Sequence, residues 1–155
     1  MSERLPDETP ATIDRFIVQS PYGRLLGLRG DSVEADRVRV RLPFRPDVTT
    51  LGEMVHGGAI ASLVDVAATA AAWASPRATL GARGSTVGFS LSFLAPALGK
   101  DLVADARVVQ RGSTLCICEV AVADDAGRDV ARALVTYRLS LPKPAGGAAP
   151  EKAQP

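Results

Sequence analysis

The longest run of apolar residues in this chain extends from Val55 to Ser75 and is interrupted by a single charge, Asp65. The only histidine, His56, stands near its start and is followed by two glycines, and half of the residues from 59 to 74 are alanine. Such a composition predicts a helix that is buried on nearly all sides. A carboxylate is costly inside such a helix unless it is paired or used in chemistry, so Asp65 is a candidate functional residue.

Shorter elements are expected before this helix. Thr12–Ser20 has an N-cap residue and apolar side chains on one face, which predicts a short helix that ends at Pro21-Tyr22-Gly23. Leu25–Arg29 and Val33–Leu42 read as strands, and the alternation fails near the start of the second, where a bulge or a later start is expected. Pro43–Val55 is a long connection beside the apolar segment, where functional loops are common.

After the helix the apolar period changes from that of a helix to that of a strand. Four strands are predicted, and they are Val87–Phe93, Ala104–Val108, Leu115–Ala123 and Ala131–Leu139. Short turns between successive strands favour antiparallel pairing. The pattern therefore predicts an α+β fold in one domain, 11–141, in which a curved antiparallel sheet packs on the long helix. The segments 1–10 and 142–155 are expected to be disordered tails.

Composition narrows the classes of function. The chain has 155 residues and a net charge of +1, with no basic run or aromatic platform of the kind that binds nucleic acid, and no basic amphipathic helix for a membrane surface. Met1–Ala11 lacks the apolar core of a secretory signal. Cys116 and Cys118 read as reduced core thiols, and with one distant histidine they are too few for a metal site. We expect a cytoplasmic protein without a metal.

Several short motifs together resemble a known family, the PaaI-like acyl-CoA thioesterases of the hotdog fold. The resemblance covers about Leu25 to Leu141, and its motifs are His56-Gly57-Gly58 followed by Asp65, Ser92-Phe93-Leu94-Ala95-Pro96-Ala97 with Gly99, Val109-Gln110-Arg111-Gly112, and the turn Asp125-Ala126-Gly127. The resemblance implies a single hotdog domain, in which the sheet wraps the central helix and two subunits join their sheets edge to edge.

The resemblance also implies roles for two residues. Asp65 would be the nucleophile or general base, and the backbone N–H of Gly57 would bind the thioester carbonyl oxygen, which suits the positive end of a helix. The two residues are eight positions apart, which is roughly 10–12 Å along one helix. Gly57 and Asp65 of one helix therefore cannot act on the same carbon. We expect a homodimer at minimum, with active sites at the interface, and a dimer of dimers as the whole assembly.

Other candidate residues surround this pair, and each has an alternative structural reading. His56 either contacts substrate or fixes the turn, Asp65 could be a carboxylate capped by backbone N–H groups, and the glycines could serve close packing. Many relatives carry Asn or Gln six residues before the histidine, but Thr50 stands there and reaches less far. Thr86 is expected to orient the attacking water. No Ser-His-Asp triad is expected, because Ser62 lies within the helix without a nucleophile elbow.

The sequence also offers candidate binding residues for the coenzyme A and acyl parts of the substrate, each with a structural alternative. The turn Arg111-Gly112-Ser113-Thr114 offers a cation, hydroxyls and N–H groups to phosphates, or it is an ordinary hairpin turn. Glu53 reads as a solvated charge rather than a second acid/base group. Some aromatic and aliphatic side chains either line the acyl pocket or form core, with core favoured for most, and they are Leu63, Trp73, Phe89 and Phe93.

The leading hypothesis is hydrolysis of an acyl- or aroyl-CoA thioester to the free acid and CoA, with Asp65 as base or nucleophile. Coenzyme A is then part of the substrate, and no separate cofactor is expected. The alternative is a non-catalytic acyl-CoA-binding protein on the same fold, which Thr50 in place of an amide keeps open. A hotdog dehydratase ranks low because its motifs differ around His56. The pattern does not identify the acyl group.

Overall fold

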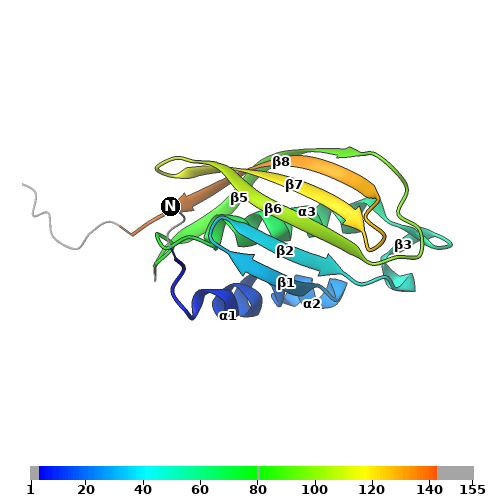
Figure 1. Ribbon diagram of the computed structural model, residues 1–155, viewed down its shortest axis with the longest axis horizontal. Coiled ribbons are helices and arrows are strands. Elements are labelled where there is room, and N and C mark those ends of the chain that lie inside the picture. Colours follow the sequence, from blue (N-terminus) through cyan, green and yellow to red (C-terminus); the bar gives the residue numbers. More distant parts are fainter. Residues whose placement is uncertain (1–3, 80, 143–155) are drawn as a thin grey trace, which may run out of the picture.

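The computed structural model describes residues 4–79 and 81–142, which form one curved antiparallel sheet around a central helix (Figure 1). The sheet has six strands in the order β1-β2-β6-β7-β8-β5. Their bounds are β1 Arg29–Glu34, β2 Arg37–Leu42, β5 Arg83–Phe93, β6 Leu102–Arg111, β7 Leu115–Asp124 and β8 Asp129–Ser140. The helix, α3, spans Gly57–Trp73. The predicted α+β arrangement is confirmed.

One strand pairing differs from the expected order. β6, β7 and β8 follow one another as antiparallel neighbours, but β5 pairs with β8 at the far edge of the sheet. Residues 94–101 carry the chain from the end of β5 across to β6. The prediction that β5 leads through a short turn into its neighbour was wrong, because this connection spans the width of three strands.

The central helix is covered by the sheet on one side only. Nine of its residues are buried, and it contacts β2, β6, β7 and β8 more than it contacts the edge strand β5. A stripe along its other flank is only half-buried and consists of Ala61, Ser62, Asp65, Val66 and Thr69. The expectation of burial on nearly all sides therefore fails along this stripe, which contains the one charge of the helix.

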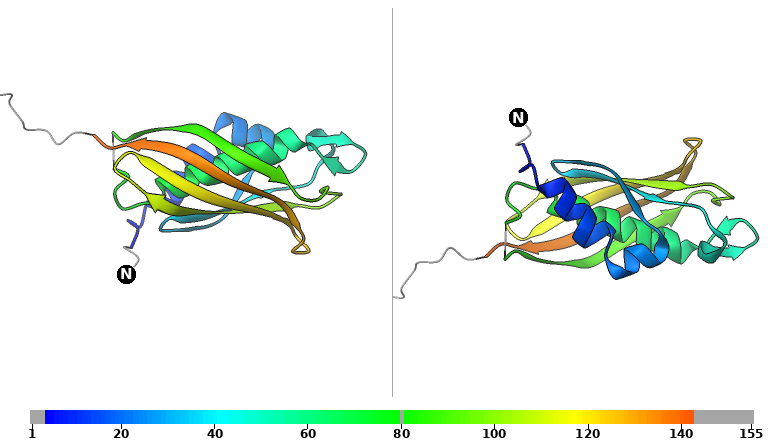
Figure 2. Two further views of the ribbon diagram at one scale, coloured as in Figure 1. Left: turned by 90° about the horizontal axis from the view of Figure 1, so that it is seen from above. Right: turned by 90° about the horizontal axis from the view of Figure 1, so that it is seen from below.

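The N-terminal segment packs beneath the sheet and alongside α3, as the right-hand view of Figure 2, seen from below, shows. α1 covers Thr9–Ile13, a π-helical turn covers Asp14–Val18, and α2 covers Pro21–Leu26. The predicted helix before Pro21 is confirmed, although it begins at Thr9 and ends at Val18. The strand predicted from Leu25 was wrong, because Pro21–Leu26 forms α2. Ser20 caps α2 by accepting a hydrogen bond from Gly23 N at 3.3 Å, and proline is favoured at the first helical position.

The segment Val33–Leu42 contains the turn of a hairpin, and its strand begins only at Arg37, which confirms the later start that the failed alternation predicted. Asp36 has φ 60°, a left-handed conformation that aspartate tolerates, and it turns the chain between β1 and β2. This turn explains why the alternation failed near Val33. A second, small hairpin follows, in which a 3₁₀ turn at Pro46–Val48 leads to β3 (Thr49–Leu51) and β4 (Met54–Val55). β4 delivers the chain to the start of α3.

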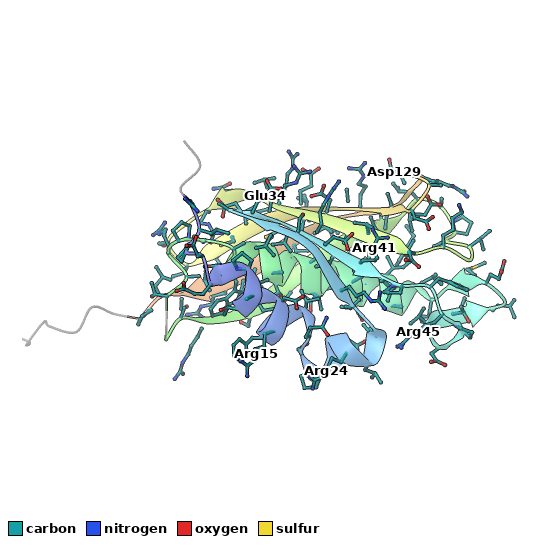
Figure 3. The ribbon with its side chains drawn as sticks, turned by 60° about the horizontal axis from the view of Figure 1, so that its bottom comes forward. Arg15, Arg24, Glu34, Arg41, Arg45 and Asp129 are labelled. Atoms are coloured by element: carbon teal, nitrogen blue, oxygen red, sulfur yellow. The ribbon has the colours of Figure 1, made fainter. Side chains whose placement is uncertain are left out.

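The ends of the expected domain fall partly outside the described residues. Within the predicted tail 1–10, Thr9 and Pro10 form the first turn of α1, and the predicted tail 142–155 lies outside the described residues from 143 onward. Among residues 4–79 and 81–142, no helix is long and apolar enough to cross a membrane. Figure 3 shows Arg15 and Arg24 projecting from the N-terminal helical segment, away from the core.

Candidate active site

One backbone N–H group in the first turn of α3 has no hydrogen-bond acceptor among the described residues. His56 is the N-cap residue, and its Nδ1 accepts a hydrogen bond from Gly58 N at 2.8 Å. Ala59 N and Ile60 N donate to the His56 carbonyl oxygen at 2.9 and 3.2 Å. Among the described residues, Gly57 N–H has no acceptor. An unpaired amide at the positive end of a helix suits a developing negative charge.

The same hydrogen bond defines the tautomer of the neutral His56 ring. Because Nδ1 accepts the Gly58 hydrogen bond, the neutral imidazole carries its proton on Nε2. The ring is exposed and fixes the turn as a cap, while Nε2–H remains available as a donor. The capping contact is the positioning role that the sequence left open, and it does not exclude a contact with substrate through the other nitrogen.

Asp65 is held by a residue of the neighbouring strand. Thr86 Oγ1 on β5 donates a 2.6 Å hydrogen bond to Asp65 Oδ1, and both residues are half-buried. The register of β5 shifts between Thr86 and Gly88, which makes Val87 a bulge. Thr86 pairs with the buried Tyr137 and so lies on the helix side of the sheet, where it can reach Asp65.

Gly57 and Asp65 do not meet within one chain. Asp65 lies eight residues after Gly57 on the continuous helix α3. At about 1.5 Å per residue, the rise between them along the helix axis is about 12 Å. A thioester carbon needs both groups within hydrogen-bond or bonding reach, so a site that uses both requires a second copy of the chain.

A groove of about 350 Å³ opens beside Gly57. It lies between the start of α3, β4 and the segment that follows β5, and none of its nine lining residues carries a charge. The larger side chains in the lining are Met54, Ile60, Phe93 and Leu94. The position and apolar lining of this groove suit the hydrophobic part of a small ligand.

Among the described residues, no strand pairs with the outer edge of the sheet next to this groove, and this edge is apolar. β5 is the last strand of the sheet, and Phe89 and Phe93, on its helix side, are 42% and 55% exposed. The bulged Val87 is 62% exposed on the same strand. A free edge with this much exposed apolar surface is typical of a surface that binds another molecule.

A second set of hydrogen bonds ties α2 to the start of α3. Ser62 Oγ donates to the Gly58 carbonyl oxygen at 2.8 Å and lies 2.9 Å from Tyr22 Oη. Since the serine has one proton, the tyrosine hydroxyl is the donor in the second contact. Ser62 is thereby hydrogen-bonded to the backbone and to the tyrosine rather than to His56.

The two polar residues of the small hairpin are exposed. Thr50 lies on β3, and its hydroxyl makes no hydrogen bond within residues 4–79 and 81–142. Glu53 is exposed at the turn before β4, where its carbonyl oxygen accepts from Gly99 N at 3.0 Å. Neither side chain is bonded to Asp65, which takes its hydrogen bond from Thr86.

The turn predicted for coenzyme A is built around a structural arginine. The side chain of Arg111 is 15% exposed, and its guanidinium donates to Asp36 Oδ1 at 2.6 Å, to the Ala72 carbonyl oxygen at 3.1 Å and to Cys116 Sγ at 3.1 Å. It thereby joins the end of α3 to the β1–β2 turn. Gly112 N donates to Leu115 O. The exposed hydroxyls of this turn are those of Ser113 and Thr114.

A cation that the sequence analysis did not single out lies beside this turn. Arg77 is exposed in the segment after α3 and, with Arg111, Gly112 and Ser113, lines a small notch. Within the described residues its side chain forms no ion pair closer than 4.0 Å. No motif surrounds Arg77, so only the fold places it here. Tyr22 was missed for the same reason, since its contact spans 40 residues.

The far end of α3 is closed by an aromatic pair. Trp73 Nε1 donates to Tyr137 Oη at 2.8 Å, and burial raises the pKa of the tyrosine hydroxyl. Burial likewise raises the pKa of the Cys118 thiol to about 12, so both free cysteines are protonated core thiols. Within the described part of the chain, no three His, Cys, Asp or Glu residues are grouped to hold a metal.

Of the four hydrophobic residues considered for the acyl pocket, two pack in or against the core and one lines the groove. Leu63 is fully buried, and Trp73 packs half-buried against the core. Phe93 is exposed and lines the groove at Gly57, so core packing holds for two of the four residues rather than for most of them. Phe89 is exposed on the same strand. Both phenylalanines are exposed because β5 is an edge strand. The alternation of apolar and polar residues does not predict the order of strands in a sheet.

Comparison with known proteins places this geometry in context. Residues 52–131 match the model of the thioesterase superfamily. A protein of Halobacterium salinarum named as a candidate esterase is 32% identical over 119 residues, which are 75% of this chain and 78% of that protein. A second candidate esterase, from Saccharolobus solfataricus, is 23% identical over 81% of each chain.

Solved structures give the same fold. A thioesterase family protein from Silicibacter pomeroyi superposes with a TM-score of 0.77 at 25% identity, over 87% of this chain and 98% of that one. The E. coli PaaI protein of the phenylacetic acid degradation operon gives 0.74 at 18% identity, over 84% and 93%. A Streptococcus pneumoniae thioesterase protein solved with coenzyme A gives 0.66 at 22% identity, over 74% and 87%.

Proposed function

Because this chain belongs to the thioesterase superfamily, we propose that it hydrolyses an acyl- or aroyl-CoA thioester to the free acid and CoA. The observation that carries the proposal is the half-buried Asp65 carboxylate, tied to Thr86 on the flank of α3 that the sheet leaves open. A carboxylate in that position can take a proton from water or attack a carbonyl carbon itself. The S. pneumoniae neighbour with bound coenzyme A supports a CoA substrate.

The proposed site is shared by two subunits. The substrate carbonyl oxygen accepts a hydrogen bond from Gly57 N–H of the partner subunit, while Asp65 lies on the opposite side of the carbonyl. The rise of about 12 Å between the two residues on one helix supports this division. The unpaired, apolar edge at β5 is the surface through which the two sheets join. A dimer of dimers is the proposed complete assembly.

The chemistry follows from these positions. Asp65 takes a proton from a water molecule whose oxygen attacks the thioester carbon, and Thr86 holds the carboxylate in place for that step. The carbonyl π electrons move to oxygen, and the oxyanion is stabilised by the glycine amide, a contribution of about 3 kcal/mol. The C–S bond then breaks as the carbonyl re-forms, and CoA leaves as a thiol with the proton from Asp65. In the alternative route the Asp65 carboxylate attacks the thioester carbon itself, the C–S bond breaks, and CoA leaves as a thiolate that takes a proton from water. Water then hydrolyses the mixed anhydride, which releases the free acid and regenerates Asp65.

The proposed contacts of the CoA phosphates are the hydroxyls of Ser113 and Thr114 with the cation of Arg77. Arg111 supports their turn from beneath, since its guanidinium already has three protein partners. Gly112 gives the turn its shape. The proposed phosphate site therefore stays at the predicted turn, 111–114, but its positive charge comes from Arg77 instead of Arg111.

The test is a panel of acyl-CoA substrates with a chromogenic thiol reagent. The expected result is CoA release by the wild type and a loss of at least about 100-fold in Asp65→Asn. Asp129→Asn, an exposed carboxylate on β8, is the matched control and should keep full activity. The buried cysteines, with their raised pKa, should add little background. Tight acyl-CoA binding without any CoA release would instead establish the non-catalytic binding protein.

A further inference from the structure

The groove beside Gly57 has a chemical character that narrows the substrate. All nine residues that line it have apolar side chains or none, and Phe93 and Leu94 present large exposed surfaces to it. The lining offers no cation to pair with a carboxylate and no side-chain hydroxyl or amide for a polar substituent. A group that enters this groove must therefore be uncharged, because a buried unpaired charge is strongly disfavoured.

The groove also stands at the reacting end of the proposed substrate. Gly57, whose N–H is the unpaired donor, is itself part of the lining. A thioester carbonyl at that amide has two arms, the acyl group and the sulfur with its long polar CoA chain. The acyl arm is the one that matches an apolar surface, since the CoA arm carries amides and phosphates.

Phe93 limits the space at this point. Its ring atoms Cζ, Cε1 and Cε2 lie 3.3, 3.6 and 3.9 Å from where a Cβ on Gly57 would be. The ring therefore forms the wall of the groove directly against the oxyanion amide. The groove has a volume of about 350 Å³, which lies within the range of ligand pockets and can receive a medium-length or aromatic acyl group.

We infer that this groove receives the acyl part of the substrate, that this part is uncharged and apolar, and that Phe93 sets its length. The inference rests on the proposed thioesterase function and adds the substrate class and its selecting residue. A hexanoyl or phenylacetyl thioester fits this description. A six-carbon dicarboxylic thioester, with a charge at its far end, does not.

The experiment compares kcat/KM for hexanoyl-, phenylacetyl-, dodecanoyl- and adipoyl-CoA in the wild type, Phe93→Ala and Phe93→Trp. The wild type should prefer hexanoyl over adipoyl by about 100-fold or more, because the groove cannot compensate the carboxylate. Phe93→Ala should raise the dodecanoyl-to-hexanoyl ratio by about tenfold, and Phe93→Trp should lower it. Leu134→Ala, which removes an equally exposed apolar side chain (54%) on the outer face of β8, should leave the ratio unchanged.

Each outcome separates this inference from the proposed function. A wild type that releases CoA from none of the four substrates contradicts the function itself. A wild type that is active but accepts adipoyl-CoA as well as hexanoyl-CoA overturns the inference alone. An unchanged chain-length ratio in both Phe93 variants also overturns the inference. This holds whether or not light scattering shows a changed oligomeric state in these variants. The tryptophan variant keeps the test valid if the alanine variant does not fold.

Discussion

Thr86 Oγ1 donates a 2.6 Å hydrogen bond to Asp65 Oδ1, and the bulge at Val87 places the threonine on the side of β5 where it can do so. A hydrogen bond to a charged group contributes about 1.5–3 kcal/mol. Thr86→Val keeps the shape and removes the donor, so we expect kcat to fall by about 10- to 100-fold with little change in KM. Thr86→Ser should recover most of kcat. Steady-state kinetics on an accepted substrate make the measurement, and equal activity of the valine variant would contradict the role.

Arg111 is predicted to act in stability rather than in binding. Its removal leaves the Ala72 carbonyl oxygen and Asp36 without a partner at the end of α3. Arg111→Met should lower the free energy of unfolding by about 2–3 kcal/mol, a value discounted because the Asp36 carboxylate is half-exposed.

Urea unfolding of Arg111→Met and Arg77→Met separates the two arginines. We expect Arg77→Met to leave the unfolding midpoint unchanged and to raise KM for CoA substrates, since its cation is exposed beside the proposed phosphate contacts. The reverse pattern, with an unchanged midpoint and a raised KM in Arg111→Met, would show that Arg111 and not Arg77 binds coenzyme A.

The packing of Tyr137 against the backbone gives a third prediction. A Cβ on Gly84 would lie 2.6 Å from Tyr137 Cε1, whereas a Cβ on Gly88, four residues along the same strand, would meet nothing within 4 Å. Gly84→Ala should therefore destabilise the protein by about 1–3 kcal/mol through overpacking.

Gly88→Ala is the matched control and should be close to neutral. Trp73 is the only tryptophan and donates to Tyr137, so its fluorescence reports the displacement directly. We expect a changed emission spectrum in Gly84→Ala only. Identical spectra and unfolding midpoints for both variants would contradict the close contact.

The outer face of the sheet supplies a pH-dependent contribution. The hydrogen bond from Arg37 holds the pKa of Asp105 below its ordinary value of 3.8. Since the folded carboxyl binds its proton less readily than the unfolded one, it stabilises the fold above about pH 4, and that stabilisation is lost as the pH falls through the folded pKa.

Asp105→Asn should therefore cost about 1 kcal/mol of unfolding free energy near neutral pH, a modest value because Arg37 is half-exposed. The difference from the wild type should shrink as the pH falls below about 4. Chemical denaturation across this range makes the comparison. A difference that persists unchanged at low pH would show that the carboxylate charge is not the cause.

The central helix and the core strands could be predicted because their signals are local. The alanine-rich run with its charge at Asp65, the apolar run in β7 and the alternation in β8 each predict one element from its own residues. The capping role of His56 was one of two readings for the same reason, since a cap lies next to the helix it begins.

The rest depended on turns and on long-range order. Pro21 was read as a helix stop, whereas after the Ser20 cap it starts α2. Asp36 turns the chain at a position where no glycine marks the turn. The bulge at Val87 reverses which side of β5 the preceding residues face, and the pairing of β5 with β8 leaves Phe93 exposed. The alternation of apolar residues within one segment predicts neither the register of that strand nor which strand it pairs with.

The claim that each site combines Asp65 of one subunit with Gly57 of the partner subunit is tested most directly by mixing two inactive subunits. Gly57 is the first residue of α3, where proline is tolerated, so Gly57→Pro deletes the amide donor without breaking the helix. Gly57→Ala carries a Cβ but keeps the donor, and it controls for crowding against Phe93.

The measurement is CoA release by a heterodimer of Gly57→Pro and Asp65→Ala subunits, purified through two different tags. Each homodimer should be inactive, and the heterodimer should recover about half of the wild-type activity, because one of its two sites then contains both functional groups. A heterodimer as inactive as its parents would contradict a shared site.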